Sequence, residues 1–320
     1  MHGRATLLPP GGSVGLTADV AGRAAIKALC AVVNDRLGVI AASTENAPKS
    51  LNGAIRHALL APGKRIRPLL VLLTTAQFGH DPMRALDAAC AVELVHTASL
   101  VLDDLPCMDD ANTRRGIAST HIAFSEATAM LAAIAMLTRA FNVLARMEGL
   151  PVAARNDLTA ILSYAAGSDG LTSGQERDLT ERCPTDALDK INVINDQKTG
   201  ALFVAALQMG GRVAAVDDAC LAALAVAGRE IGLAFQAYDD VIDMSRSPAE
   251  AGKDTGKDQG KATVATVLGL DEARAQVALH IGQAHLALEP YAAGNGPLRM
   301  FISAMFEPAM PATAVPPPAA

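Results

Sequence analysis

Apolar residues recur at helical spacing along almost the whole chain. They fall at i, i+3, i+4 and i+7 in successive segments, and no segment shows the apolar–polar alternation of a strand. Turns rich in glycine and proline, such as 79–82 and 149–151, separate these segments. The pattern predicts helices at 21–42, 50–60, 65–78, 83–104, 119–148, 152–166, 170–182, 186–210, 216–245, 271–288 and 297–306.

Composition supports one large helical domain. Of the 320 residues, 51% are hydrophobic but only 3% are aromatic, so small and aliphatic side chains must fill the core. No change of composition in the middle of the chain marks a linker. We therefore expect an all-α, single-domain helical bundle at 21–307, between a flexible leader at 1–20 and a disordered, Pro/Ala-rich tail at 308–320.

Charge and cysteine usage narrow the possible partners and the compartment. The formal net charge of −6 gives no broad basic surface for nucleic acid. The 5 cysteines form no CxxC pair and have no histidine at metal-binding spacing, which is typical of reduced thiols in the cytoplasm. The leader lacks the features of a secretion signal. We expect a cytoplasmic protein that does not bind nucleic acid.

The most apolar segment runs from 127 to 137. It contains Thr128 and is followed by Arg139, and it is shorter than the ~20 residues that cross a bilayer. We expect a buried helix here and no membrane span.

Carboxylates gather at the end of the predicted helix 83–104. Asp103 and Asp104 close the apolar segment, and Asp109 and Asp110 follow. Carboxylates that border an apolar core need cations or hydrogen-bond donors to offset desolvation and mutual repulsion. This placement indicates a cation-binding role.

A second acidic cluster ends the predicted helix 216–245. Asp239 and Asp243 share a helix face at i and i+4, and Asp240 lies beside them. Hard oxygen ligands suit Mg²⁺, particularly where a substrate phosphate completes the coordination. A single DDxxD sequence could equally be a solvated helix end without function. Two such clusters favour a clamp for a diphosphate.

Cationic residues accompany the acidic clusters. Lys64 and Arg67 lie at the start of an apolar helix. Arg114 and Arg115 follow the first cluster directly. The planar guanidinium group suits diphosphate because it can bond two oxygens at once. A surface network of ion pairs would explain the arginine pair equally well.

Other groups suited to phosphate lie near the same motifs. His96 falls on the helical stripe of the first cluster, although a histidine on an apolar helix is more often a core residue than a ligand. Lys198 and Thr199 add a cation and a hydroxyl within a predicted helix. The loop at 252–261 alternates lysines, including Lys253, with glycines but lacks the order of a nucleotide P-loop. ATP is therefore not implied.

Together these motifs resemble the trans-isoprenyl diphosphate synthase family. GKRIRP, ELVHTASLVLDD, DDx4D followed by RRG, GxxxGQxxDL, KTG, FQAYDDVID and GKDxxxD occur in the family's order between Lys64 and Lys261. The sequence of the first acidic motif is most similar to that of bacterial geranylgeranyl diphosphate synthases of carotenoid pathways. The resemblance implies a bundle around a central hydrophobic cavity, usually a homodimer, that condenses isopentenyl diphosphate with dimethylallyl, geranyl or farnesyl diphosphate.

The resemblance also implies roles for individual residues. The ligands of about three Mg²⁺ ions, which Mn²⁺ could replace, would be Asp103, Asp109 and Asp239, assisted by Asp104, Asp240 and Asp243. The allylic diphosphate would be held by Arg114, Lys198 and Lys253. Isopentenyl diphosphate would be held by Lys64, Arg67, His96 and Arg115. The reaction centre would be lined by Thr199 and Gln236.

Product length is expected to depend on the residues one turn before the first aspartate. Ala98 and Ser99 lie about 5–6 Å below the metal site and are small, whereas farnesyl synthases of this family often carry an aromatic there. Small residues leave room for a C20 product. The alternative is that both are ordinary packing residues and that depth is set elsewhere. A farnesyl diphosphate (C15) synthase is the alternative for the product.

Other activities fit the sequence less well. A terpene cyclase shares the fold but would not need the GKRIRP motif, and no Asn/Ser/Glu second motif is present. A non-catalytic regulatory subunit of a heteromeric synthase would normally have lost an aspartate motif, and both are intact. A di-metal carboxylate bundle would need Glu-x-x-His pairs, which the chain does not supply.

Overall fold

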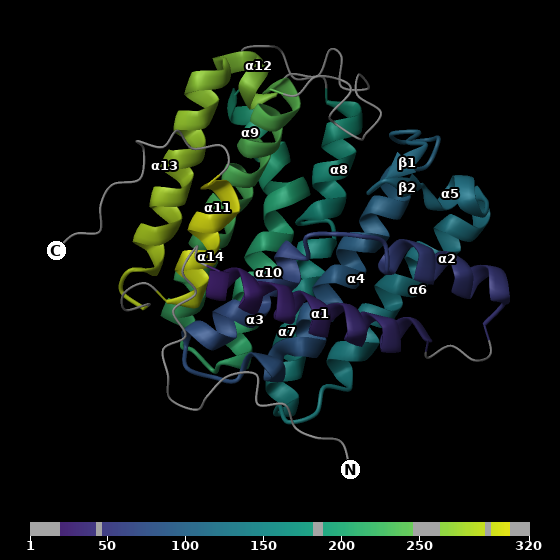
Figure 1. Ribbon diagram of the computed structural model, residues 1–320, viewed down its shortest axis with the longest axis horizontal. Coiled ribbons are helices and arrows are strands. Elements are labelled where there is room, and N and C mark those ends of the chain that lie inside the picture. The colour runs from purple at the N-terminus through teal and green to yellow at the C-terminus, as the bar shows by residue number, and fades with distance from the viewer. Residues whose placement is uncertain (1–19, 43–46, 182–187, 246–262, 292–295, 308–320) are drawn as a thin grey trace.

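The computed structural model describes residues 20–42, 47–181, 188–245, 263–291 and 296–307 (Figure 1). The leader up to residue 19, the loop 246–262 with Lys253, and the tail 308–320 lie outside the described residues. The described residues fold as an all-α bundle, as predicted. Its helices are α1 (Val20–Ala42), α2 (Lys49–Leu59), α3 (Ile66–Gln77), the 3-10 helix η1 (Pro82–Ala85), α4 (Leu86–Asp103), α5 (Thr120–Ala123), α6 (Glu126–Ala145), α7 (Val152–Ala166), α8 (Leu171–Thr180), α9 (Leu188–Asn195), the π-helix η2 (Asp196–Gly200), α10 (Ala201–Val213), α11 (Asp218–Ser245), α12 (Val264–Leu268), α13 (Leu270–Leu288) and α14 (Pro297–Phe306).

Helices α4, α10 and α11 organise the core. Helix α4 packs against α6, α3, α10 and α1, while α11 packs against α13 and α10. The buried side chains are mostly alanine, leucine and valine, which lets the helices approach closely as the composition predicts. Because α4 and α11 carry the two acidic clusters at their carboxyl ends, the core helices themselves determine where the clusters lie.

A short hairpin interrupts the helical pattern. Strands β1 (Thr113–Arg114) and β2 (Ile117–Ala118) pair antiparallel, and Figure 1 shows them beside α5 at one end of the bundle. The turn between them uses Arg115 and Gly116, both at positive φ. The hydrophobic pattern predicts no strand here, because two residues are too few to show alternation.

Two of the predicted helices differ in detail from the helices of the structure. The segment 119–148 forms two helices, since the side chain of Ser125 accepts a hydrogen bond from the Thr128 backbone at 3.1 Å and starts α6 anew. In the predicted segment 186–210, the helix that begins at Leu188 continues without a gap but changes to π geometry at η2. Helix α12 was not predicted, and it begins at a capping box formed by Thr263 and Thr266.

The prediction that 127–137 is a buried helix is wrong for one face of α6. Leu131 and Ile134 are each 56% exposed and Met130 is 42% exposed. By length and composition alone, two helices of the described ranges, Pro82–Asp103 and Glu126–Ala145, could cross a membrane. The apolar window is 67% buried in the first and 33% in the second. Periodicity identified the helix but could not show what covers its second face.

Candidate active site

The first acidic cluster separates into two kinds of aspartate. Asp103 ends α4, and a hydrogen bond of 2.9 Å from the Asp109 backbone to the Asp103 carbonyl folds the next loop back toward it. Burial, opposed by nearby Lys198, raises the pKa of Asp103 to about 6, and the charge of Asp109 adds to that rise. Asp104 is buried instead and accepts from Arg114 Nε at 2.8 Å. An added cation would therefore offset the desolvation of the Asp103 carboxylate, whereas Asp104 is already paired with the guanidinium of Arg114.

In the second acidic cluster, one aspartate is bound within the protein. The oxygens of buried Asp240 accept from Gln236 Nε2 at 3.1 Å and from the Val264 backbone at 2.9 Å, which ties α11 to the first turn of α12. Burial raises the pKa of Asp240 to about 6 despite these bonds. Asp239 is half-buried one residue before it, and Asp243 is exposed near the end of α11.

The π-helix η2 lies between the two clusters. Lys198 Nζ donates to Asp178 Oδ2 at 2.6 Å and is close enough to Asp103 to lower its pKa. Thr199 Oγ1 donates to Gln236 Oε1 at 3.2 Å, the same side chain that bonds Asp240. A chain of polar contacts thus connects α8, η2 and α11.

Two glycines permit this arrangement. A Cβ at Gly174 would lie 2.2 Å from the Lys198 backbone nitrogen, and a Cβ at Gly232 would lie 2.6 Å from Gly200 Cα. Such distances are too short for any side chain. The glycines of α8 and α11 therefore let η2 pack deeply enough for Lys198 and Thr199 to reach the site.

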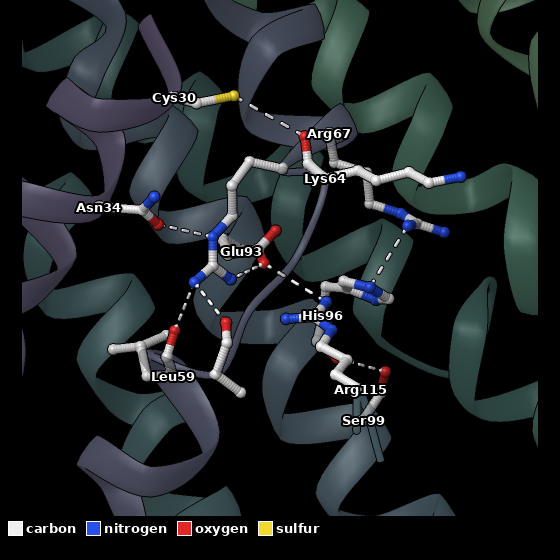
Figure 2. Close-up of polar contacts among 11 residues, drawn as sticks. Cys30, Asn34, Leu59, Lys64, Arg67, Glu93, His96, Ser99 and Arg115 are labelled. Carbon is white, nitrogen blue, oxygen red and sulfur yellow. Dashed lines mark hydrogen bonds and ion pairs between the residues drawn. The ribbon is translucent and has the colours of Figure 1, made fainter. Parts of the chain in front are cut away.

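The predicted isopentenyl diphosphate ligands gather between α3, α4 and the hairpin (Figure 2). Arg67 Nη1 lies 3.4 Å from His96 Nε2, and its guanidinium stacks 4.6 Å above the Phe203 ring. Burial lowers the pKa of Arg67 to about 10 and, together with the neighbouring arginines, lowers the pKa of His96 well below 6.5. Among the residues that the structure describes, buried Arg67 Nε and Arg115 Nη1 have no hydrogen-bond partner. These unused donors fit an anion.

The residues predicted to control product length lie on α4. Ala98 is fully buried and Ser99 is half-buried, with its hydroxyl donating to the His96 carbonyl at 2.9 Å. A small cleft beside this helix is lined by other residues, among them Thr97, Leu100 and Val101. The influence of Ala98 and Ser99 on product length stays a prediction.

Within the described residues, the aspartates by themselves do not form a complete metal site. In the ranges that the structure describes, no three side chains of His, Cys, Asp or Glu come close enough to bind a metal together. The half-buried Asp103, whose pKa is raised by burial, nevertheless offers the hard oxygen that Mg²⁺ prefers. The donor set fits Mg²⁺ whose remaining ligands are diphosphate oxygens and water.

Sequence reasoning missed three residues that the structure places around these groups. They are Asp178, the partner of Lys198, and the buried pair Arg65 and Glu93. One signal was available: Glu93 is an acid in the middle of an apolar helix, and a buried charge there needs a partner. The identity of that partner depends on packing between segments far apart in the chain.

Comparisons with known proteins show what the chain is similar to. The family model described as polyprenyl synthetase matches residues 48–287. A geranylgeranyl diphosphate synthase of Pantoea ananas is 40% identical over 261 residues, 80% of this chain and 85% of that protein. A farnesyl diphosphate synthase of Geobacillus stearothermophilus is 38% identical over 75% of this chain and 82% of its own. A geranyltransferase structure from Helicobacter pylori, complexed with magnesium and isoprenyl diphosphate, superposes with a TM-score of 0.76 at 27% identity, covering 88% of this chain and 95% of that one.

Proposed function

The chain belongs to the polyprenyl synthetase family, and from that premise we propose that it condenses isopentenyl diphosphate head to tail with an allylic diphosphate to give the C20 product geranylgeranyl diphosphate. One observation carries the proposal. The two acidic clusters end the core helices α4 and α11, with Lys198 between them and the basic residues Arg67 and Arg115 nearby. The allylic diphosphate that leaves would need metal ions bound at the acidic clusters, and the diphosphate that stays on the isopentenyl unit would need the basic residues.

The acidic side would bind the allylic diphosphate. Bound Mg²⁺, held by Asp103, Asp109 and Asp239, would neutralise charge that grows on the leaving diphosphate; about three ions are expected, and Mn²⁺ is a possible substitute. Lys198 would exchange its bond with Asp178 for one with that diphosphate. Arg114 and Lys253 would add further donors, and Asp243 would assist through water.

The basic side would bind isopentenyl diphosphate. Lys64, Arg67, His96 and Arg115 would hold its diphosphate and fix its double bond against the allylic carbon. The allylic carbon–oxygen bond breaks, the double bond attacks the resulting cation, and the departing diphosphate accepts the proton released. Thr199 and Gln236 would border the reacting carbons. No side chain of the chain is then needed as a dedicated base.

We extend the proposal to a homodimer in the cytoplasm. The exposed face of α6 with Met130, Leu131 and Ile134 would be covered by the same face of a second copy, because an apolar patch of this kind is costly in water. Light scattering should give twice the chain mass, and Leu131→Glu with Ile134→Glu should give a monomer. A wild-type monomer would contradict this part of the proposal. The domain boundaries at 21 and 307 predict that a chain trimmed to them stays folded.

A product-length assay tests the function directly. Purified protein should convert isopentenyl diphosphate with geranyl or farnesyl diphosphate into a C20 product when Mg²⁺ is present, and chelator should abolish the reaction. Ala98→Phe should shift the product toward C15 by raising the floor of the cavity. A C15 product from the wild type would keep the reaction but exclude the C20 assignment. No condensation by folded protein would favour a regulatory subunit instead.

The C20 product would serve as a precursor of carotenoids. This part of the proposal rests on the sequence of the first acidic motif, which resembles that of bacterial geranylgeranyl diphosphate synthases of carotenoid pathways. Expression beside enzymes that turn geranylgeranyl diphosphate into a coloured carotenoid should give pigment. An active enzyme without pigment would contradict it.

A further inference from the structure

A buried ion pair lies beside the basic residues. Arg65 Nη1 donates to Glu93 Oε1 at 2.6 Å, and both side chains are 2% exposed. Arg65 also donates through Nε to Asn34 Oδ1 at 2.8 Å and through Nη2 to the carbonyls of Leu59 and Ala61 at 2.9 and 3.0 Å (Figure 2). Removal of these charges from water is favourable only in an accurate geometry, so the pair fixes the groups that it joins.

Arg65 fixes the backbone that carries two of the basic residues. It immediately precedes α3 and has a φ of 51°, a left-handed conformation that few residues other than glycine adopt. Its bonds to α1 and to the end of α2 hold that conformation in place. Lys64 is its neighbour and Arg67 follows two residues later, so Arg65 determines where both side chains start.

Glu93 connects the same loop to the other basic residues. It lies on α4 one turn before His96, and its Oε1 is also 3.6 Å from Arg115 Nη2. Its charge opposes the effect of burial, which lowers the pKa of Arg115. One carboxylate therefore faces arginines from both the α2–α3 loop and the hairpin turn, as Figure 2 shows for Glu93 and Arg115.

We propose that Arg65 and Glu93 are positioning residues that hold the basic ligands of isopentenyl diphosphate at the spacing its diphosphate requires. The inference rests on the function proposed above. Neither residue would touch the substrate, because both side chains are only 2% exposed. Their effect should therefore be specific to isopentenyl diphosphate and should not extend to the allylic diphosphate.

The test is a comparison of KM values for the two substrates. Glu93→Gln keeps the shape and an acceptor for Arg65 but removes the charge shared with Arg115. The KM for isopentenyl diphosphate should rise about tenfold, as for the loss of one charge-assisted hydrogen bond. The KM for the allylic diphosphate and kcat at saturation should stay within about twofold.

A second variant guards against loss of folding. Arg65→Met combined with Glu93→Leu replaces the buried pair by apolar groups, which buried sites often tolerate. The matched control is Arg36→Met with Asp87→Leu, because that pair joins α1 to the other end of α4 at 2.7 Å. The KM for isopentenyl diphosphate should rise in the first double variant and stay unchanged in the control.

The outcomes separate the two proposals. An unchanged KM for isopentenyl diphosphate in active variants, or an equal rise for both substrates, would overturn the positioning role while leaving the function intact. A folded wild-type protein that does not join isopentenyl diphosphate to an allylic diphosphate would refute the function, and the positioning role with it.

Discussion

The basic and acidic regions of the site differ in how the fold balances their charge. Around Arg67 and Arg115 the protein supplies its own counter-charge, Glu93, which opposes the lowering of both pKa values by burial. Around Asp103 and Asp240 burial outweighs the nearby donors and raises both pKa values to about 6. The basic region is therefore organised by the chain itself, whereas the acidic region gains from added cations. Substitutions should affect substrate affinity in the first region and turnover in the second.

The largest effect is expected from Asp103→Asn. Loss of this oxygen ligand should lower kcat by about a thousandfold, since the metal and its ligands stabilise the charge of the leaving diphosphate. Because the buried carboxyl of Asp103 has a raised pKa, the amide should also raise the free energy of unfolding of the metal-free protein at pH 7 by about 1–2 kcal/mol. Steady-state kinetics and thermal unfolding measure the two effects. A large loss of activity with loss of stability would instead indicate a structural role.

The next effect should come from the basic region. Arg67→Gln removes buried donors beside His96 and should raise the KM for isopentenyl diphosphate by about a hundredfold, which corresponds to about 2.7 kcal/mol. The KM for the allylic diphosphate should change little. Arg36→Gln, at a partly exposed ion pair of α1, provides a matched control. An equal rise in both KM values would contradict the assignment of isopentenyl diphosphate binding to the basic region alone.

Asp240→Asn should have a smaller effect than Asp239→Asn. Both oxygens of Asp240 accept hydrogen bonds within the protein, from Gln236 and from the Val264 backbone, so an amide loses one of them. Loss of one hydrogen bond opposes relief of the buried charge, whose pKa is raised to about 6, so the free energy of unfolding at pH 7 should change by no more than about 1 kcal/mol. We expect about a tenfold fall in kcat, against about a thousandfold for Asp239→Asn. Equal falls in kcat for both variants would assign Asp240 to the metal rather than to the anchor of α12.

The sequence predicted the helices well because each has a strong apolar period. It could not predict the hairpin, whose strands have two residues each, or the break before Ser125, where one cap competes with a continuous apolar pattern. It also could not show that one face of α6 stays exposed in a single chain. Periodicity reports that a face is apolar, not what covers it.

The site was predicted to the level of motifs but not of contacts. Adjacent aspartates such as Asp103 and Asp104 look alike in sequence, yet Asp103 lies near Lys198 whereas Asp104 is bound to Arg114. The difference depends on a contact with the hairpin. Likewise, the partner of Glu93 lies 28 residues earlier in the chain. Long-range pairing of this kind follows from packing, which spacing along one segment does not encode.

The smallest predicted effect concerns the protonation of His96. Burial and the charges of Arg67 and Arg115 lower the pKa of His96 well below 6.5 in the folded protein, while the unfolded chain keeps the ordinary value. Well above pH 6.5 the residue is neutral in both states, and it adds no pH dependence to the free energy of unfolding. Below pH 6.5 the unfolded state takes up a proton that the folded state does not, so stability falls as pH falls.

Comparison with His96→Gln isolates this effect. The free energy of unfolding of the wild type, minus that of the variant, should decrease by up to about 1 kcal/mol per pH unit between pH 6.5 and 5.5 and should be flat between pH 7 and 8. Titration of the aspartates is common to both proteins and cancels in the difference. A difference that does not vary with pH would show that His96 is protonated as easily in the folded protein as in the unfolded chain. The basic region would then not suppress further positive charge, and its contrast with the acidic region would be lost.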